Sequence, residues 1–392
     1  MARKIILAID DSDCSISAAK WACETLARPG DELHLVGCQG IISAGMGPAL
    51  PAATAGSVAA FTATYHDALK QEEQRVKSLL TTVKNEILKR PDLHLHSLPA
   101  AGGASGVGES IVSWAKHEHA DLVVLGSRGM GAVKSTFMSV VGLGSVSEYC
   151  LHHVDRGAVA IVHGTDLSKH KEVRKVLVAV DDSHHAQHAQ KWCIENVLGP
   201  KDELHIVSVA LPVPYVAGVQ APILGASVPG VAAGDFEAEF RGALEHAQSV
   251  ALHALHAALA SEKIAADDAA AAHVLEVAEE DEVSEDSREY AQTTVKNAVE
   301  FATEKCKVDK ERVFFKALEP EGGASDISLS IKHYQEANGI DVVVVGSRGM
   351  GAVKRALFSL VGLGSVSDWC AHNMSCPVIV IKGAEEPAVA KD

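Results

Sequence analysis

The fold is decided by Asp121-Leu122-Val123-Val124-Leu125-Gly126-Ser127-Arg128-Gly129-Met130-Gly131 and by its near copy at 341–351. The short apolar run predicts a buried strand, and the glycines that follow it predict a tight turn. Glycine lets backbone N–H groups approach an anion, and the N-terminus of a following helix adds unpaired donors and partial positive charge. Each stretch therefore predicts a strand that ends in a phosphate cradle. A tight strand-to-helix turn that binds nothing is the alternative.

The chain is an internal duplication. The residues Gly126–Lys134 return letter for letter at Gly346–Lys354, an offset of 220. Near the start of each copy the offset is smaller, because Asp10 aligns with Asp181 at an offset of 171. The second half therefore carries 49 additional residues between its second and third strands. A repeat of this size fixes the number of domains at two.

Apolar runs alternate with stretches of helical period in both halves. The first half predicts strands at 3–9, 32–38, 92–98, 121–126 and 158–163, and helices at 12–27, about 61–90, 105–118 and from 145. The second half predicts strands near 174–181, 203–209, 312–318, 341–346 and 377–382. This alternation favours an α/β fold of two tandem, doubly wound, mostly parallel five-stranded sheets. Ligands of such sheets lie beyond the carboxyl ends of the strands, where the strand order reverses.

The predicted domains span 1–165 and 172–384, followed by a tail at 385–392. Residues 39–60 and 210–234 are rich in glycine, alanine and proline, and we expect both to be loops after the second strand of each half. An acidic block at 262–289 belongs to the insertion in the second half. Like charges in such density favour a solvated surface excursion, with docking of an unknown protein partner as the alternative.

The composition excludes several classes of partner. A net charge of −16 argues against binding to nucleic acid or to an anionic membrane through bulk electrostatics. Because the eight cysteines are scattered without a C-x-x-C pair, we expect reduced thiols in a cytoplasmic protein, with neither a disulfide framework nor a bound metal. No run of about 20 apolar residues is present to span a membrane.

These motifs together resemble the universal stress protein family. The resemblance lies in Ala-(Ile/Val)-Asp-Asp-Ser on the first strand, Val-(Leu/Val)-Gly-Ser-Arg-Gly on the fourth, the Gly-Ser-Val-Ser helix start and a closing Pro-Val-Ile-Val strand. It covers nearly the whole chain except 39–60, 210–290 and the last ten residues. It implies a Rossmann-like fold of the adenine nucleotide alpha hydrolase type, pairing of domains through their last strands, and a possible homodimer. It also implies binding of ATP or AMP, with Mg²⁺ as a possible companion, in a stress response that needs no substantial catalysis.

The resemblance also implies a role for particular residues. Asp10 and Asp181 are expected to meet the adenosine end of the nucleotide. The other expected contacts are the strand ends Ala8, Ile9, Ala179 and Val180, the apolar walls Cys38 and Val209, the phosphate loops Gly126, Arg128, Gly129, Gly346, Arg348 and Gly349, and the helix starts Gly144, Ser145, Val146, Ser147, Gly364, Ser365, Val366 and Ser367.

One departure concerns the length of the loop. Nucleotide-binding members show Gly-x2-Gly-x9-Gly-(Ser/Thr), whereas 14 residues separate Gly129 from Gly144, and the second half has the same spacing. The extra residues either bulge outward as an additional turn or widen the cradle until it no longer holds a triphosphate. The stretch Ser145-Val146-Ser147-Glu148 also fits a capping box, which explains its serines without any ligand.

Three hypotheses follow. The first is a tandem nucleotide-binding stress protein in which occupancy changes conformation or partners. The second is a structural or interaction protein of the same fold that binds no nucleotide. The third, a weak ATPase, is the least favoured, because the sequence contains no Gly-x-Ser-x-Gly and no Gly-x4-Gly-Lys-(Ser/Thr).

Overall fold

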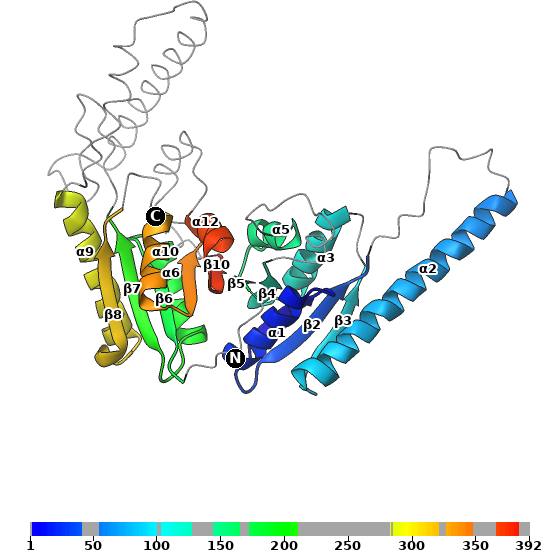
Figure 1. Ribbon diagram of the computed structural model, residues 1–392, viewed down its shortest axis with the longest axis horizontal. Helices are drawn as coiled ribbons and strands as arrows, with labels where there is room; N and C mark the ends of the chain where they lie inside the picture. The colour runs from blue at the N-terminus through cyan, green and yellow to red at the C-terminus, as the bar shows by residue number, and fades with distance from the viewer. Residues whose placement is uncertain are drawn as a thin grey trace, which may run out of the picture. The chain divides into compact units, whose positions relative to one another are not determined.

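The computed structural model describes residues 2–40, 55–99, 103–127, 143, 145–164, 172–210, 283, 285–320, 327–347 and 366–383 (Figure 1). The side chains of 55–64 and 103–105 are not described. Contacts divide the chain into one unit of Met1–Leu211 with Arg288–Asp392 and a second unit of Pro212–Ser287. The first unit contains every strand described below.

The first half alternates strands and helices as its sequence predicts. Its elements are β1 (Lys4–Ile9), α1 (Asp13–Thr25), β2 (Glu32–Cys38), α2 (Ala55–Thr82) continued by the π-helical η1 (Val83–Leu88), β3 (His94–Leu98), α3 (Gly103–His117), β4 (Leu122–Gly126), α5 (Ser145–His153) and β5 (Ala158–Val162). One boundary differs from expectation, because α2 begins at Ala55, inside the segment that we expected to be a loop.

The second half repeats this order. Its elements are β6 (Lys175–Ala179), α6 (His184–Asn196), β7 (Glu203–Val209), α9 (Glu285–Glu300) continued by η2 (Phe301–Lys305), η3 (Lys310–Arg312), β8 (Val313–Leu318), α10 (Ile327–Asn338), β9 (Val342–Gly346), α12 (Val366–Asn373) and β10 (Val378–Ile381). The end of the acidic block is helical, since α9 begins at Glu285; the rest of 262–289 lies outside the described residues except Val283.

The strands of both halves form one sheet of ten strands, in the order β3-β2-β1-β4-β5-β10-β9-β6-β7-β8. Each half contributes five parallel strands whose order reverses between β1 and β4, or between β6 and β9. The halves meet where β5 and β10 pair antiparallel, from Val378 opposite Ile161 to Ile381 opposite Ala158. This is the pairing of last strands that the family resemblance implies.

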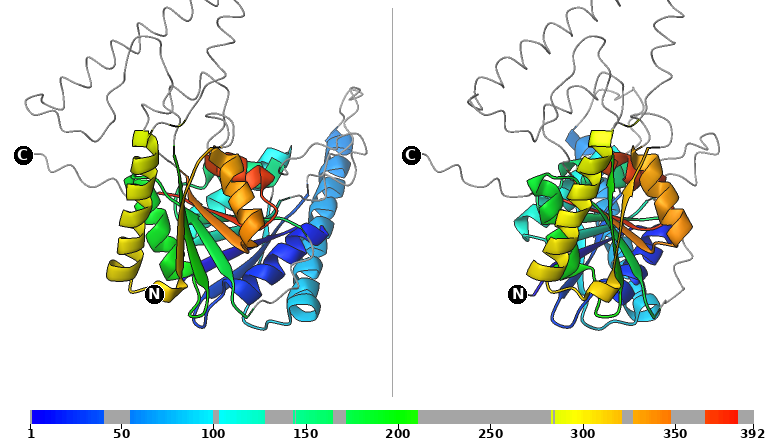
Figure 2. Two further views of the ribbon diagram at one scale, coloured as in Figure 1. Left: turned by 60° about the vertical axis from the view of Figure 1, so that its left-hand side comes forward. Right: turned by 90° about the vertical axis from the view of Figure 1, so that its left-hand side faces the viewer.

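Helices cover both faces of the sheet (Figure 2). In β1, Ile5, Leu7 and Ile9 join a buried cluster that also takes side chains from α1, α2, α6 and α9. Ile6 and Ala8 point to the other face, where the cluster includes side chains of α3, α5, α10 and α12. A parallel strand buried on both faces needs a continuous apolar run, which is what each strand sequence supplies.

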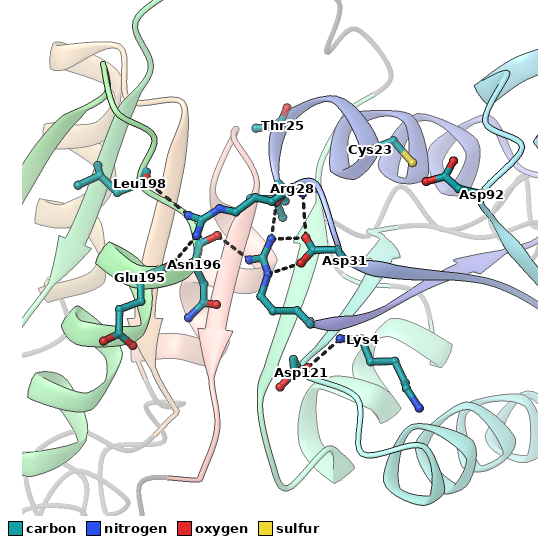
Figure 3. Close-up of polar contacts among 12 residues, drawn as sticks. Lys4, Cys23, Thr25, Arg28, Asp31, Asp92, Asp121, Glu195, Asn196 and Leu198 are labelled. Atoms are coloured by element: carbon teal, nitrogen blue, oxygen red, sulfur yellow. Dashed lines mark hydrogen bonds and ion pairs between the residues drawn. The ribbon is translucent and has the colours of Figure 1, made fainter. Parts of the chain in front are cut away.

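A second junction between the halves lies near the amino ends of the strands. Arg3 forms an ion pair with Asp31 at 2.5 Å and donates to the carbonyl of Asn196 at 2.8 Å. The second half mirrors this, because Arg174 pairs with Asp202 and donates to the carbonyl of Thr25 at 3.0 Å. Figure 3 shows Arg28 beside this junction, where it donates to the backbone of Glu195 and Leu198. We call the Arg3–Asp31 and Arg174–Asp202 pairs the arginine clasp.

None of the helices in the described part of the chain combines the length and the apolar character that crossing a bilayer requires.

Candidate functional site

The candidate site of each half lies at the carboxyl edge of its parallel strands. Asp10 follows β1 and Gly126 ends β4, and these two strands are neighbours at the point where the strand order reverses. Asp181 and Gly346 hold the same positions in the second half. The two aspartates therefore occupy the edge at which doubly wound sheets bind their ligands.

Each of these aspartates is held in a tight turn at a helix start. Asp10 Oδ1 accepts from the backbone N–H of Ser12 at 3.0 Å and from its hydroxyl at 2.5 Å. Ser12 is in turn the N-cap of α1 and accepts from the N–H of Ser15 at 3.2 Å. Because the carboxylate is fixed by the turn, its position at the sheet edge is set before any ligand arrives.

The second half builds the same turn. Asp181 Oδ1 accepts from the N–H of Ser183 at 3.0 Å and from the Ser183 hydroxyl, and Ser183 caps α6 by accepting from the N–H of Ala186 at 3.1 Å. The preceding strand ends also correspond: Ala8, Ile9 and Val180 are buried, and Ala179 is half-buried. The duplicated Asp-Asp-Ser motif therefore forms the same local structure twice.

Gly126 is required by packing. A Cβ atom at this position would lie 2.8 Å from the carbonyl carbon of Cys14 and 2.9 Å from the backbone nitrogen of Ser15, which is closer than real Cβ atoms approach. The N-terminus of α1 thus lies directly on the end of β4. Strand pairing extends one residue past the glycines. The N–H of Ser127 donates to the carbonyl of Val162 in β5, and that of Ser347 donates to the carbonyl of Ile381 in β10.

The serines at the start of α5 have different environments. Ser147 is buried, and its hydroxyl donates to the carbonyl of Gly126 at 2.7 Å, so it ties α5 to the end of β4. Ser145, the first residue of the helix, is exposed, and Val146 packs against the core. In the second half Ser367 is buried like Ser147, and Val366 packs like Val146. Of the described serines at these helix starts, Ser145 is the one that solvent reaches.

The second aspartate of each motif is where the two halves differ. Asp11 forms an ion pair of 2.5 Å with Arg75 of α2, and Arg75 also pairs with Glu72 at 2.8 Å. In the second half, α9 brings Tyr290 to Asp182. Burial and the hydrogen bond to Asp182 both raise the pKa of Tyr290. Sequence reasoning missed Arg75, Glu72 and Tyr290, because nothing in a helix sequence tells which loop its outer face meets.

The expected apolar walls lie at the ends of β2 and β7. Cys38 is half-buried, its thiol lies 3.8 Å from the carbonyl oxygen of Val107, and burial raises its pKa to about 12. Val209 is half-buried and packs against the same face of the sheet as Cys38. Cys38 therefore contributes an uncharged, apolar side chain to this edge of the sheet at physiological pH.

The phosphate-binding part of the expected site lies outside the described residues. This applies to Arg128, Gly129 and Gly144 in the first half and to Arg348, Gly349, Gly364 and Ser365 in the second. The described part contains the adenosine-side aspartates, the strand ends, Gly126, Gly346 and the remaining residues at the helix starts.

A pocket of about 610 Å³ lies elsewhere, at the amino ends of the strands. Its lining includes Trp21, Arg174, Asp202 and Asp341. Arg174 directly precedes β6 and Asp341 directly precedes β9, whereas Asp181 and Gly346 lie at the opposite ends of these strands. The pocket is thus separate from the candidate site, and the clasp residues Arg174 and Asp202 already occupy part of its wall with their own ion pair.

The curated relatives include two from Arabidopsis thaliana. Universal stress protein PHOS34 is 33% identical over 162 residues, which are 38% of this chain and 58% of that protein. Universal stress protein PHOS32 is 49% identical over 47 residues, which are 12% of this chain and 19% of that protein. The chain thus matches less than two thirds of the length of either relative.

Solved structures give weaker likenesses. A universal stress protein from Archaeoglobus fulgidus is 16% identical with a TM-score of 0.41, and the match covers 98% of this chain and 97% of that one. A universal stress protein solved in complex with cAMP is 20% identical with a TM-score of 0.23, and the match covers 41% of this chain and 97% of that one.

The family model gives the most extensive match. The model described as the universal stress protein family matches residues 1–163, 172–251 and 243–382. The first match covers the first half, and the other two together cover the second half with its insertion. The matches thus extend over most of the chain, and the chain belongs to the universal stress protein family.

Proposed function

We propose that each half binds an adenine nucleotide, ATP or AMP, at the carboxyl edge of its parallel strands. The proposal rests on one observation: both halves form the same turn, and it fixes Asp10 and Asp181 where the strand order of each sheet half reverses. A carboxylate held there accepts hydrogen bonds from the hydroxyls of a ribose or from an exocyclic amine. Membership of the universal stress protein family supports the choice of ligand.

The phosphates would then lie over the glycine stretch toward the start of α5 or α12. Helix N-termini attract anions through unpaired N–H groups and the helix dipole. In the first half the exposed Ser145 is available as an additional donor, whereas the hydroxyl of Ser147 is already donated to Gly126. Occupancy of the two sites would act in a cytoplasmic stress response by changing conformation or partners, without substantial catalysis. Mg²⁺ would accompany ATP through its phosphates.

Titration calorimetry of the full chain with ATP, AMP and adenosine tests the proposal. We expect binding with a dissociation constant of about 1 mM or tighter. Removing one charged acceptor costs on the order of 1.5–3 kcal/mol, so the double variant Asp10→Asn/Asp181→Asn should bind about tenfold to a hundredfold more weakly. Asp92→Asn is the matched control, because Asp92 is an exposed aspartate paired with Arg90.

Three outcomes would count against the proposal. If ATP does not bind at millimolar concentration, the chain is better explained as an interaction protein of the same fold. If the double aspartate variant binds ATP as well as the parent while both remain folded, the ligand lies elsewhere. If Arg128→Ala weakens ATP and adenosine equally, the glycine stretch does not hold the phosphates.

A further inference from the structure

Four side chains gather where α5 of the first half meets α12 of the second. Glu148 and His152 lie on α5, and Asp368 and His372 lie on α12. Within each helix the acid and the histidine are four residues apart, so they share one face. The pairs also correspond through the duplication, since 148 and 368, like 152 and 372, differ by 220. The cluster therefore brings together the same two positions of both repeats.

The side chains contact one another across the junction between the halves. His152 Nε2 lies 3.0 Å from Glu148 Oε1 and 3.2 Å from Asp368 Oδ1. His372 Nε2 lies 2.8 Å from the other oxygen of Glu148, Oε2. One ligand atom each of Glu148, His152 and Asp368 all lie within 4.8 Å of one another. Each histidine thus reaches the acid of the opposite helix.

These separations suit a small divalent ion. Zinc bonds to imidazole nitrogen and carboxylate oxygen at about 2.0–2.2 Å, so the edges of its coordination tetrahedron are roughly 3.3–3.6 Å. The His152 contacts at 3.0 and 3.2 Å are a few tenths of an ångström shorter than such an edge. Small movements of these side chains would therefore make room for an ion between His152 Nε2, Glu148 Oε1 and Asp368 Oδ1.

His372 holds one of these side chains from outside the three converging atoms. Its Nδ1 lies 2.7 Å from the backbone carbonyl oxygen of Asp368, which fixes the orientation of the ring. Its Nε2 contacts Glu148 Oε2, the carboxylate oxygen that His152 does not contact, at 2.8 Å. Side chains that hold a ligating carboxylate in this way are typical of metal sites.

The structure thus assigns a further site, and we propose that Glu148, His152 and Asp368 bind one divalent transition-metal ion of the zinc class, with His372 as the outer partner that holds Glu148. One imidazole and two carboxylates, with a further position left for water, form a donor set that suits zinc and its neighbours better than Mg²⁺ or Ca²⁺, which prefer oxygen alone. The two carboxylates balance the charge of the ion. His152 is 50% and Glu148 40% exposed, so an ion can enter from solvent. Because the ligands come from both repeats, the ion links the two halves.

Zinc calorimetry with the metal-stripped full chain in a non-thiol reductant tests the site. We expect one ion per chain at this site, and at least a tenfold loss of affinity in His152→Gln, in Glu148→Gln and in Asp368→Asn. His153→Gln is the matched control, because His153 is the next residue on α5 and contacts the carbonyl and ring of Tyr149 instead. It should bind zinc as the parent does.

Cobalt distinguishes these ligands from the eight cysteines. Bound Co²⁺ should give the visible absorption of a tetrahedral site without the charge-transfer band of a thiolate, and this spectrum should disappear in Glu148→Gln. Zinc should also raise the melting temperature of the parent and leave that of Glu148→Gln unchanged, which separates lost binding from lost folding. Thiolate-ligated cobalt, zinc binding equal in parent and Glu148→Gln, or no binding at micromolar zinc would each overturn the proposal.

Discussion

At the scale of single residues, Ser147 shows that a motif typical of phosphate binding can instead stabilise the fold. The Gly-Ser-Val-Ser stretch predicts both a helix start and a phosphate contact, yet the Ser147 hydroxyl is donated to a strand carbonyl at 2.7 Å. Ser147→Ala would leave the buried carbonyl of Gly126 without this donor, so we expect the free energy of unfolding to fall by about 1–3 kcal/mol. Urea denaturation measures this loss.

The matched control for this change is Ser78→Ala, on the exposed surface of α2. It should alter the free energy of unfolding by about 0.5 kcal/mol or less. Nucleotide binding gives a second comparison, because a structural role for Ser147 predicts lost stability with unchanged affinity in the protein that remains folded. An unchanged stability with weakened ATP binding would instead assign the hydroxyl to the ligand.

Asp31 gives a residue-scale prediction about pH. Burial acts to raise the pKa of Asp31, but hydrogen bonds from Arg3 and from the backbone of Arg28 outweigh it and lower that pKa below its usual value. The ionised carboxylate therefore stabilises the fold above about pH 4, and this contribution is lost as the pH falls through the lowered pKa. Asp31→Asn should lose about 2–3 kcal/mol at pH 7, and its difference from the parent should shrink in acid.

Asp92→Asn is again the control, since an arginine lowers the pKa of Asp92 too. The Asp92 side chain is 49% exposed, whereas that of Asp31 is 6% exposed, so the Arg90–Asp92 pair is screened by water. Its loss should cost about 1 kcal/mol at most. Urea denaturation at several pH values measures both variants, and a pH-independent difference between Asp31→Asn and the parent would contradict the assignment.

At the scale of elements, α3 and α5 come close together because α3 has a glycine at their contact. A Cβ atom at Gly108 would lie 2.7 Å from Tyr149 Cδ1 and 2.8 Å from Tyr149 Cβ. We expect Gly108→Ala to force the helices apart and to lower the free energy of unfolding by about 1–3 kcal/mol. Thermal and urea denaturation provide the measurement.

A double-mutant cycle provides the control for this contact. Tyr149→Ala removes Cγ and Cδ1, two of the three atoms that the new methyl group meets, so the double variant should be more stable than the sum of the single changes implies, by about 0.5 kcal/mol or more. The buried Ser328 holds the corresponding position in the second half, where a Cβ atom is already present. Additive effects of Gly108→Ala and Tyr149→Ala would show that the helix contact is not the cause.

The elements also show what the sequence alone predicts well. Buried strands such as Leu122–Gly126 and Val342–Gly346 read as apolar runs, because both faces of a parallel strand are covered. The start of α2 was predicted less well, since the Ala- and Ser-containing residues from Ala55 carry no strong helical period. The sequence predicted that Asp10 and Asp181 follow the first strand of each half, but not the turns that their carboxylates form with Ser12 and Ser183.

Other parts of the candidate site depend on tertiary contacts that no local pattern encodes. The partner of Asp11 is 64 residues away on α2, and that of Asp182 lies on α9, beyond the insertion. The proposed metal site depends on the register of α5 against α12, which is set when β5 and β10 pair. The duplication placed Glu148 and Asp368 in equivalent positions, but only the assembled sheet brings them together.

At the scale of the whole molecule, the two halves share one sheet and should unfold together. The antiparallel pairing of β5 with β10 continues the hydrogen-bond ladder across the junction, and the two buried clusters also extend across it. The arginine clasp adds contacts in both directions, from Arg3 to Asn196 and from Arg174 to Thr25. Unfolding one half alone would expose the apolar edge of the other and leave its ladder unpaired.

Tryptophan fluorescence tests this cooperativity, because each half contains two of the four tryptophans. Replacing Trp192 and Trp369 by phenylalanine leaves probes in the first half, and replacing Trp21 and Trp114 leaves probes in the second. Within each variant, we expect the fluorescence transition in urea to coincide with the loss of helical circular dichroism, as a single cooperative unit requires. Arg3→Ala/Arg174→Ala should lower both midpoints together. The contrary result is a fluorescence midpoint that differs from the circular dichroism midpoint in the tryptophan variants that keep Arg3 and Arg174. The halves would then unfold independently, and the shared sheet would add little to their stability.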